Sequence, residues 1–489
     1  MALSVERKDT SFLPDFKKVI ARFFPIDSMR TTELVMRIYY MPDEEAEMTL
    51  NQILREFSKR HRNMTRIFNK HFNKVKHVFS DLEIDIEDLS ELKRLLIGSY
   101  FTMEYSIESA AFFNPSIVED PDQSGLEEGE KRVIMSFRAT GEGHISSLVF
   151  RRGVLDKENN LEVQEPGKMI DEAQRVKRHQ YNKKSFSNKL EEMDIPESLY
   201  SLVLDKLPEQ FFYKQIKEVV QDIVEKNEIN VEKQKVLQEI IWLADSHYEI
   251  NFSMDTDISE RVIFPIGERE KKGIEDARFV KFKNEDGTSE YFATYTGYDG
   301  YTIIPKLIRT KDFYHFKAIP IYGKYAQDKN LALFPRKING KYVMLSRIDG
   351  KNNYIMFSSQ INNWENAKLL QQPTHPWEYI QVGNGGSPIE TEEGWLMLTH
   401  GVGPMRKYSL GACLLDLDDP SKVIGCLKEP LLTPNEKERD GYVPNVVYTC
   451  GAMIHNNHLI IPYAMADYAT GLATIELNEL LDELKLSMF

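Results

Sequence analysis

The sequence predicts a mainly β protein with helical additions. From about residue 100 onward, short β-forming runs alternate with Gly, Asn and Asp turns, as in residues 132–153 (RVIMSFRATGEGHISSLVFRRG). DG and NG pairs between such runs are typical of β-hairpins. Helical spacing is confined to the first 95 residues, a later segment and the C-terminus. We therefore expect an N-terminal helical region at residues 1–95, and a β domain at residues 96–489 with a helical insertion at about residues 190–248.

The helical segments are predicted from apolar residues at three- and four-residue spacing. In the N-terminal region these residues are Met64, Phe68, Phe72, Val75 and Phe79. The same spacing returns in the insertion, and we expect a last helix at Leu477–Leu486.

The hairpins are spread over nearly four hundred residues, which favours a β-propeller over a sandwich. Radial blades can accommodate that much antiparallel sheet, whereas a single sandwich cannot. No strict sequence repeat is present, so a barrel or a double sandwich is the alternative.

Composition excludes several classes of protein. The 489 residues include 76 acidic and 62 basic side chains, a net charge of −14, which disfavours a nucleic-acid partner. The three cysteines, Cys413, Cys426 and Cys450, form no CxxC pair, which argues against a disulfide framework and a thiolate metal site. The N-terminus lacks the apolar core of a signal peptide, and no apolar run is long enough for a membrane span. We expect a reduced, cytoplasmic protein with no membrane partner.

Motif searches find no nucleophile elbow, no phosphate-binding loop and no dinucleotide fingerprint, and we expect no metal and no cofactor. What remains are polar clusters beside the predicted strands, where propeller loops converge on one face. They contain Arg138, Glu142, His144, Glu275, Asp276, Arg278, Lys329, Asn330, Arg347, His400 and Asp467. These clusters predict an anionic or polyhydroxylated ligand.

Several motifs, in their order along the chain, resemble glycoside hydrolase family 130, the five-bladed β-propeller enzymes that act on β-mannosides. The motifs are FNPSIV, SFRATGEGHISS, GIEDARF, YFATYTGYDG, NLALFPRKINGKYVMLSR, GWLMLTHGV, LLDLDDPSKVIG, ERDGYVPNVVY and AMAD. The resemblance covers about four fifths of the chain, from Tyr100 to the C-terminus without the insertion. The N-terminal extension is similar to that of a longer subgroup, which acts on β-1,2-linked mannosides.

The resemblance implies roles for individual residues. Asp276 matches the family's proton donor, whose proton is thought in some members to pass through a sugar hydroxyl. Ala277 replaces the family's usual proline, which changes turn rigidity more than chemistry. The residues expected to bind sugar are Asn114, Arg138 and Asp467 at the cleavage subsite, Tyr298 and Asp299 at its neighbour, and also Glu275 and Arg278.

Phosphate binding distinguishes the phosphorylases of this family from its hydrolases. The resemblance assigns phosphate binding to Lys329, Asn330, Arg347 and His400, with three cationic groups if His400 is protonated. Gln381 stands where many members have a lysine, which weakens the pocket because charge-assisted bonds are the stronger ones. A hydrolase would instead need a carboxylate base to activate water, and Glu438 is the candidate for that base.

The resemblance implies an inverting phosphorylase that cleaves terminal β-mannosyl units of β-mannooligosaccharides with inorganic phosphate, releasing α-mannose 1-phosphate. The alternatives are a β-mannosidase of the same fold and a non-catalytic glycan-binding propeller. The helical regions could cap the active-site mouth or form a homo-oligomer interface. Linkage, acceptor length and oligomeric state do not follow from the residues.

Overall fold

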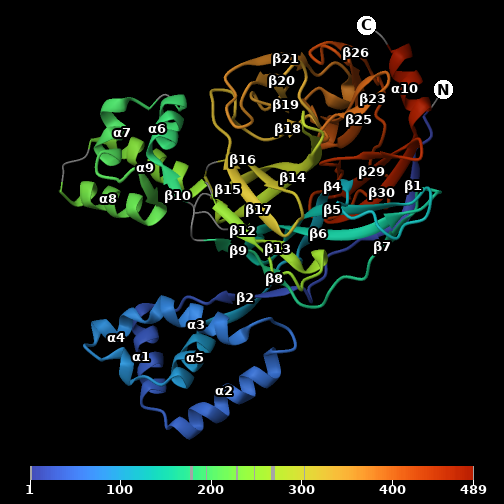
Figure 1. The fold of residues 1–489 in the computed structure, drawn as a ribbon. Coiled ribbons are helices and arrows are strands. Elements are labelled where there is room, and N and C mark those ends of the chain that lie inside the picture. The colour runs from blue at the N-terminus through green and yellow to red at the C-terminus, as the bar shows by residue number, and fades with distance from the viewer. Residues whose placement is uncertain are drawn as a thin grey trace.

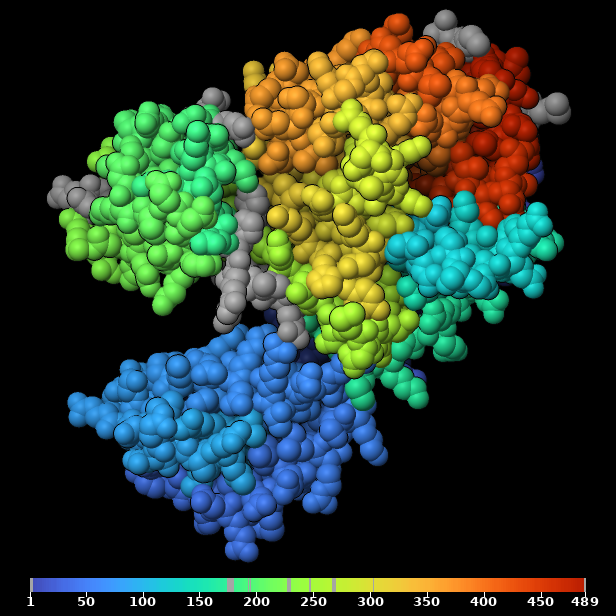
Figure 2. All heavy atoms as spheres, viewed as in Figure 1, coloured from blue at the N-terminus to red at the C-terminus, as the bar shows by residue number. Residues whose placement is uncertain are grey.

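The computed structural model describes residues 3–176, 180–193, 195–226, 230–246, 248–265, 270–301 and 303–487. It is mainly β, with two helical parts that stand apart from the sheets (Figures 1 and 2). The N-terminal helices lie below the β region in this view, and the inserted helices lie beside it.

The described N-terminal part begins with two strands, so the prediction of a helical region was wrong for Glu6–Phe12 and Val19–Phe23. Its elements are β1 (Glu6–Phe12), β2 (Val19–Phe23), α1 (Ser28–Tyr39), α2 (Asp43–Phe57), α3 (Met64–Val75), α4 (His77–Asp81), α5 (Glu91–Tyr100) and β3 (Thr102–Ser106). β1 pairs with β30 (Ala469–Glu476), close to the C-terminus, and β2 pairs with β3. Their strand partners are at least 79 residues away in the sequence, beyond the reach of local periodicity.

The inserted helical part has its own apolar core, which includes Phe186, Phe211 and Ile240. Its elements are β10 (Gln180–Asn182), α6 (Lys183–Glu192), α7 (Glu197–Leu204), β11 (Gln210–Phe212), α8 (Tyr213–Lys226) and α9 (Val231–Ser246). It is inserted between β9 (Gln174–Val176) and β12 (Tyr248–Asn251), two neighbouring antiparallel strands at the edge of a sheet.

Successive groups of four antiparallel strands make up the β region. The first group contains β4 (Ala111–Glu119), β5 (Lys131–Thr140), β6 (Ser146–Leu155) and β7 (Leu161–Val163). The second group contains β14 (Gly273–Lys283), β15 (Ser289–Tyr298), β16 (Ile303–Thr310) and β17 (His315–Pro320). These two groups belong to one twelve-stranded sheet that also contains β8 (Asp171–Glu172), β9, β12 and β13 (Arg261–Ile263).

The later groups form separate sheets. One contains β18 (Ala332–Leu333), β19 (Tyr342–Ser346), β20 (Asn353–Ser358) and β21 (Ala367–Gln371). The next contains β22 (Gln381–Asn384), β24 (Gly394–Val402), β25 (Tyr408–Leu415) and β26 (Val423–Cys426), with β23 (Ile389–Thr391) beside β24. The last contains β27 (Val447–Tyr448), β29 (His458–Met465), β30 and β1, with β28 (Met453–His455) beside β29. The first and last parts of the chain therefore share a sheet, and β1 lies beside β30 in Figure 1.

The C-terminal helix predicted at Leu477–Leu486 is confirmed by α10, which has the same bounds. Among the described residues, no helix is long and apolar enough to cross a membrane.

The expectation that the cysteines form no disulfide was wrong. Cys413 in β25 and Cys426 in β26 are directly paired across the two strands and form a disulfide, with their Cα atoms 4.1 Å apart. Cys450 is free and buried. Counting cysteines along the sequence does not detect a pair that strand register brings together.

Close packing of α5 on α3 depends on Gly98. A Cβ at Gly98 would overlap the backbone carbonyl of Phe68 in α3. We therefore expect Gly98→Ala to lower the free energy of unfolding by about 1–3 kcal/mol, the usual cost of overpacking. Thermal and urea denaturation would measure this loss. Tyr100→Ala, at an exposed position of the same helix, is the matched control. Equal stability of the two variants would contradict the close approach.

Candidate active site

The antiparallel strand order brings most of the predicted residues to one end of the sheets. The start of the first strand in a group lies beside the end of the second, as Phe113 pairs with Arg138 and Gly383 pairs with His400. Asn114 and Asp276 lie near the starts of β4 and β14, while Arg138, Tyr298 and His400 lie near the ends of β5, β15 and β24. Lys329 and Asn330 lie shortly before β18, Arg347 follows β19, and Asp467 follows β29.

Asn114 and Asp276 each occupy a β-bulge. The register of β4 with β5 shifts between Phe113 and Ser116, and that of β14 with β15 shifts between Glu275 and Arg278. Both bulge residues adopt left-handed backbone conformations, with φ of 49° at Asn114 and 54° at Asp276. Such conformations cost about 1–3 kcal/mol each and concentrate at functional sites. The bulges turn the two side chains toward each other, and Asn114 Nδ2 donates a 2.6 Å hydrogen bond to Asp276 Oδ1.

Arg138 joins the acidic residues of the GIEDARF motif. Its Nη2 donates to Glu275 Oε1 at 2.7 Å, and its Nη1 lies 3.5 Å from Asp276 Oδ1. Lys329 Nζ donates to the other oxygen of Glu275, also at 2.7 Å. Arg278 Nη1 donates to the backbone carbonyl of Asp276 at 2.9 Å.

These cations set the protonation state of Asp276. Burial pushes the pKa of Asp276 up, but the positive charges of Arg138, Arg278 and Lys329, with the hydrogen bond from Asn114, outweigh it. The pKa of Asp276 therefore lies below its ordinary value, and the free protein holds this carboxylate ionised at neutral pH.

The pKa of Asp467 is shifted in the opposite direction, upward. Its backbone is also left-handed, with φ of 50°. Burial raises the pKa of Asp467 to about 6, and the neighbouring charges of Asp276 and Glu275 add to the rise, against the opposing effect of Arg138. The site thus contains two partly buried Asp carboxyls whose pKa values are shifted apart, a common feature of catalytic sites.

Three of the four residues expected to bind phosphate, Asn330, Arg347 and His400, form a second, connected cluster, while Lys329 contacts Glu275 in the first. Asn330 Nδ2 donates to the Asn384 carbonyl at 3.1 Å, and Asn384 Nδ2 donates to the Asn330 carbonyl at 2.6 Å. His400 Nδ1 lies 3.0 Å from the Asn384 carbonyl, and His400 Nε2 lies 3.4 Å from Arg347 Nη1.

His400 is neutral in this arrangement. A carbonyl only accepts hydrogen bonds, so Nδ1 carries the proton and Nε2 accepts from Arg347. Burial, and after it the charge of Arg347, lowers the pKa of His400 to about 3. His400 therefore does not supply the third cation considered from the sequence, and it orients Arg347 instead.

Tyr448 was missed by the sequence reasoning. Its hydroxyl accepts hydrogen bonds from Arg278 Nη2 at 2.7 Å and Asn330 Nδ2 at 3.3 Å, so it links the Asp276 cluster to the second cluster. Its ring packs edge-on against His400. Tyr448 lies in the ERDGYVPNVVY motif, but a tyrosine in a β-run gives no signal of a polar role.

Three buried polar atoms in the two clusters lack hydrogen-bond partners among the described residues. They are Asn114 Oδ1, Arg278 Nε and Arg347 Nε. Buried polar groups are normally paired, so such atoms beside a site indicate donors and acceptors left for a ligand.

Tyr298 and Asp299 lie at the same end of β15 as this site, because Tyr298 pairs with Gly273 at the start of β14. Their hydrogen bonds stabilise the local turn: the Tyr298 hydroxyl donates to the Gly300 carbonyl, and Asp299 Oδ1 accepts from the Tyr301 amide, both at 2.8 Å.

Glu438 does not join either cluster through its hydrogen bonds. It accepts from Arg7 Nε at 2.7 Å, from the Tyr463 hydroxyl at 2.7 Å and from the Asn435 amide at 3.0 Å. Burial opposes ionisation, but these bonds lower the pKa of Glu438. This carboxylate ties the segment between β26 and β27 to strands β1 and β29 of the last sheet.

Among the described residues, no group of three or more His, Cys, Asp or Glu side chains is placed to hold a metal ion.

Comparison with known proteins identifies the family. A family model described as beta-1,4-mannooligosaccharide phosphorylase matches residues 219–486. A 1,2-beta-oligomannan phosphorylase of Thermoanaerobacter sp. (strain X514) is 39% identical over 220 residues, covering 44% of this chain and 71% of that protein. A beta-1,2-mannobiose phosphorylase of Listeria innocua is 31% identical over 255 residues, covering 50% of this chain and 68% of that protein.

Among solved structures, the Listeria innocua beta-1,2-mannobiose phosphorylase in complex with beta-1,2-mannobiose has a TM-score of 0.47 at 23% identity, covering 77% of this chain and 92% of that one. The family model spans more than half of the chain and includes the GIEDARF motif. The resemblance inferred from the motifs is thus confirmed, and the chain belongs to glycoside hydrolase family 130.

Proposed function

We propose that this protein is an inverting phosphorylase that cleaves terminal β-mannosyl units with inorganic phosphate and releases α-mannose 1-phosphate. The observation that carries the proposal is that Asp276, held by Asn114 and Arg138, lies in a site that also contains the cations Lys329 and Arg347, while Glu438 is occupied elsewhere. A phosphorylase needs one carboxyl group and an anion site, because phosphate is itself the nucleophile. An inverting hydrolase needs a second carboxylate free to activate water.

We also propose that the β region is a five-bladed propeller. The five groups are β4–β7, β14–β17, β18–β21, β22 with β24–β26, and β27 with β29, β30 and β1. Pairing of β1 with β30 would close the ring of blades, since it joins the two ends of the chain in the last blade.

In the proposed reaction, the bond between C1 of the terminal mannose and the glycosidic oxygen breaks, and a phosphate oxygen bonds to C1 from the opposite face. A proton that originates on Asp276 passes to the leaving oxygen, either directly or through a sugar hydroxyl. Asn114, Arg138, Glu275, Arg278 and Asp467 would hold the mannosyl unit, and Tyr298 and Asp299 would line the next subsite. Positioning and charge stabilisation would supply most of the rate.

Lys329, Asn330 and Arg347 would bind phosphate, with His400 holding Arg347 in place. The guanidinium of Arg347 has an unpaired buried Nε, and arginine matches phosphate with paired donors. Gln381, at the start of β22, can add a neutral amide donor. The reaction needs no cofactor and no metal, because phosphate is a co-substrate and the proton comes from the protein.

We propose β-1,2-mannooligosaccharides as the substrates. Relatives named for β-1,2 linkages are up to 39% identical to this chain, and a beta-1,4-mannooligosaccharide phosphorylase of Ruminococcus albus is 36% identical over 170 residues. We place the reaction in the cytoplasm, where phosphate is plentiful and a charged sugar phosphate is retained. The two helical parts are candidates for a homo-oligomer interface.

Phosphate dependence tests this function. With β-1,2-mannobiose and longer oligomers, mannose 1-phosphate should form only when phosphate is present, with free mannose measured separately. Lys329→Ala and Arg347→Ala should each raise the KM for phosphate about tenfold or more, because each removes a charge-assisted bond. Lys341→Ala, an exposed lysine at the other end of β19, is the control.

Equal release of free mannose with and without phosphate would identify a β-mannosidase and overturn the proposal. Sugar binding without any product, retained in Asp276→Asn, would identify a glycan-binding propeller.

The variant Glu438→Gln tests whether Glu438 is a structural carboxylate or a catalytic base. We expect the free energy of unfolding to fall by about 1–3 kcal/mol, because the buried pairing with Arg7 and Tyr463 is weakened. The kcat should stay close to that of the wild type. Asp276→Asn is the comparison, and it should lower kcat by about 10²–10⁴-fold, the usual contribution of a general acid. Loss of turnover in Glu438→Gln with unchanged stability would instead identify a hydrolytic base.

Asp467 should make stability depend on pH near 6. Its pKa of about 6 in the folded protein exceeds the value of about 3.9 in an unfolded chain. The ionised carboxylate therefore destabilises the fold above pH 6, and this cost disappears as the pH falls toward 4. Asp467→Asn should accordingly raise the melting temperature relative to the wild type at pH 7.5, and by less at pH 4.5. A pH-independent difference would show that Asp467 has no raised pKa.

A further inference from the structure

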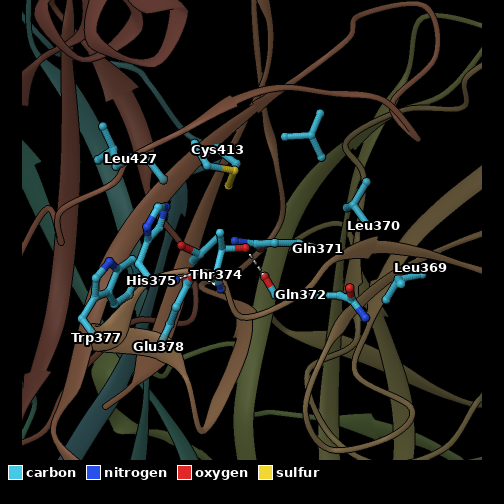
Figure 3. Close-up of a pocket in the computed structure, with 14 residues that line it drawn as sticks. Leu369, Leu370, Gln371, Gln372, Thr374, His375, Trp377, Glu378, Cys413 and Leu427 are labelled. Atoms are coloured by element: carbon cyan, nitrogen blue, oxygen red, sulfur yellow. Dashed lines mark hydrogen bonds between the residues drawn. A yellow bond between two sulfur atoms is a disulfide. The ribbon is translucent and has the colours of Figure 1, made fainter. Parts of the chain in front are cut away.

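A cavity lies apart from the candidate active site, between the sheet of β18–β21 and the sheet of β22–β26 (Figure 3). Its volume of about 340 Å³ falls at the lower end of the range for small-molecule sites, about 300–1,000 Å³. It is lined by β21, by the connection that contains the short 3₁₀ helix Pro376–Glu378, and by β24, β25 and β26. Thr399 lines this cavity, whereas the next residue in β24, His400, belongs to the active site. Side chains alternate across a strand, so the two sites lie on opposite faces of β24.

The Trp377 side chain forms one wall of the cavity (Figure 3). Its indole packs directly on the backbone of Gly401 in β24 and Gly411 in β25, since a Cβ at either glycine would overlap the ring. Its Nε1 donates to the Lys428 carbonyl at 3.0 Å, which fixes the orientation of the ring. An aromatic surface held in this way can pack against an apolar ring face with little loss of conformational entropy on binding.

Glu378 adds a buried acceptor to the same cavity. The residue is only 2% exposed. Its Oε1 accepts from the backbone amides of Thr374 at 2.9 Å and His375 at 3.2 Å. Its Oε2 has no hydrogen-bond partner among the described residues. Burial raises the pKa of Glu378. Because Glu378 lines the cavity and this oxygen accepts no hydrogen bond from the protein, it can accept one from a ligand hydroxyl.

Amide side chains complete the lining. Gln371 Oε1 accepts from Asn353 Nδ2 at 2.9 Å, which fixes that amide and leaves its Nε2 as a donor. Gln372 and Thr374 add polar groups at the edge, while Leu370 and Leu427 contribute apolar surface. An anionic ligand would face the Glu378 carboxylate, and a purely apolar ligand would leave it unpaired.

We propose that this cavity is a second carbohydrate-binding site, which takes one hexose unit of a neutral oligosaccharide. The sugar's apolar face packs on Trp377, one hydroxyl donates to Glu378 Oε2, and other hydroxyls accept from the amides of Gln371 and Gln372. The choice of a β-mannooligosaccharide as the ligand rests on the proposed function. The chemistry of the cavity fits any neutral hexose unit.

Binding stoichiometry tests this proposal. Full-length Asp276→Asn protein, without phosphate, is titrated calorimetrically with β-1,2-mannotriose and, in parallel, with β-1,4-mannobiose and cellobiose. We expect two binding sites for at least one of these sugars. Glu378→Gln keeps an oxygen for the two backbone amides but presents an amide donor in place of Oε2. It should weaken the second site about tenfold or more, the cost of one lost hydrogen bond in a buried site. It should leave the first site unchanged.

Gln372→Ala, at an exposed edge of the cavity, provides a second variant that does not depend on the buried packing. It should weaken the second site as well. Tyr379→Ala is the matched control, because Tyr379 is 61% exposed and adjacent in sequence but does not line the cavity. A single binding site for every sugar, or a second site unaffected by both cavity variants, would overturn the proposal. Failure of phosphate-dependent turnover would overturn the proposed function alone, since these titrations contain no phosphate and require no reaction.

Discussion

The position of Arg138 between Glu275 and Asp276 is the interaction on which the candidate active site depends. Three carboxyl groups, those of Glu275, Asp276 and Asp467, are gathered in a region largely shielded from water. Without cations among them, mutual repulsion and burial would force protons onto these groups. Asp467 shows this tendency to hold a proton, since its pKa rises to about 6 even with Arg138 nearby. Asp276 contacts Arg138 at 3.5 Å and stays ionised.

The sheets hold this arrangement against backbone strain. Asn114, Asp276, Asn330 and Asp467 all adopt left-handed conformations, at a cost of about 1–3 kcal/mol each. Two of them lie in bulges inside long, well-paired strands, where neighbouring hydrogen bonds on both sides leave the backbone no alternative. The same strands bury the apolar residues of the β region, so the free energy that stabilises the fold also maintains the strained positions.

Local patterns in the sequence predicted the β-rich character, the C-terminal helix at Leu477–Leu486 and the polar clusters at strand ends, because each depends on neighbouring residues. The grouping of Asp276 with Lys329 followed from motif order rather than from any local signal. Three features could not be predicted, because each depends on contacts between distant segments. β1 pairs with a strand more than 450 residues later, Cys413 meets Cys426 only through strand register, and His400 is neutral only because it is buried beside Arg347.

Among the described residues, Lys329 contacts one carboxylate, that of Glu275, and this pairing connects the anion site to the acid. With His400 neutral and Gln381 uncharged, Lys329 and Arg347 are the cations available to the proposed phosphate site. Bound phosphate would therefore draw Lys329 away from Glu275, which would then depend on Arg138. It would also offset the positive charge that lowers the pKa of Asp276. Arrival of the nucleophile would thus raise the pKa of Asp276 and favour the protonated form that the departing sugar requires. In this arrangement a low affinity for phosphate is consistent with catalysis. The same cations would interact with both the carboxylates and the phosphate.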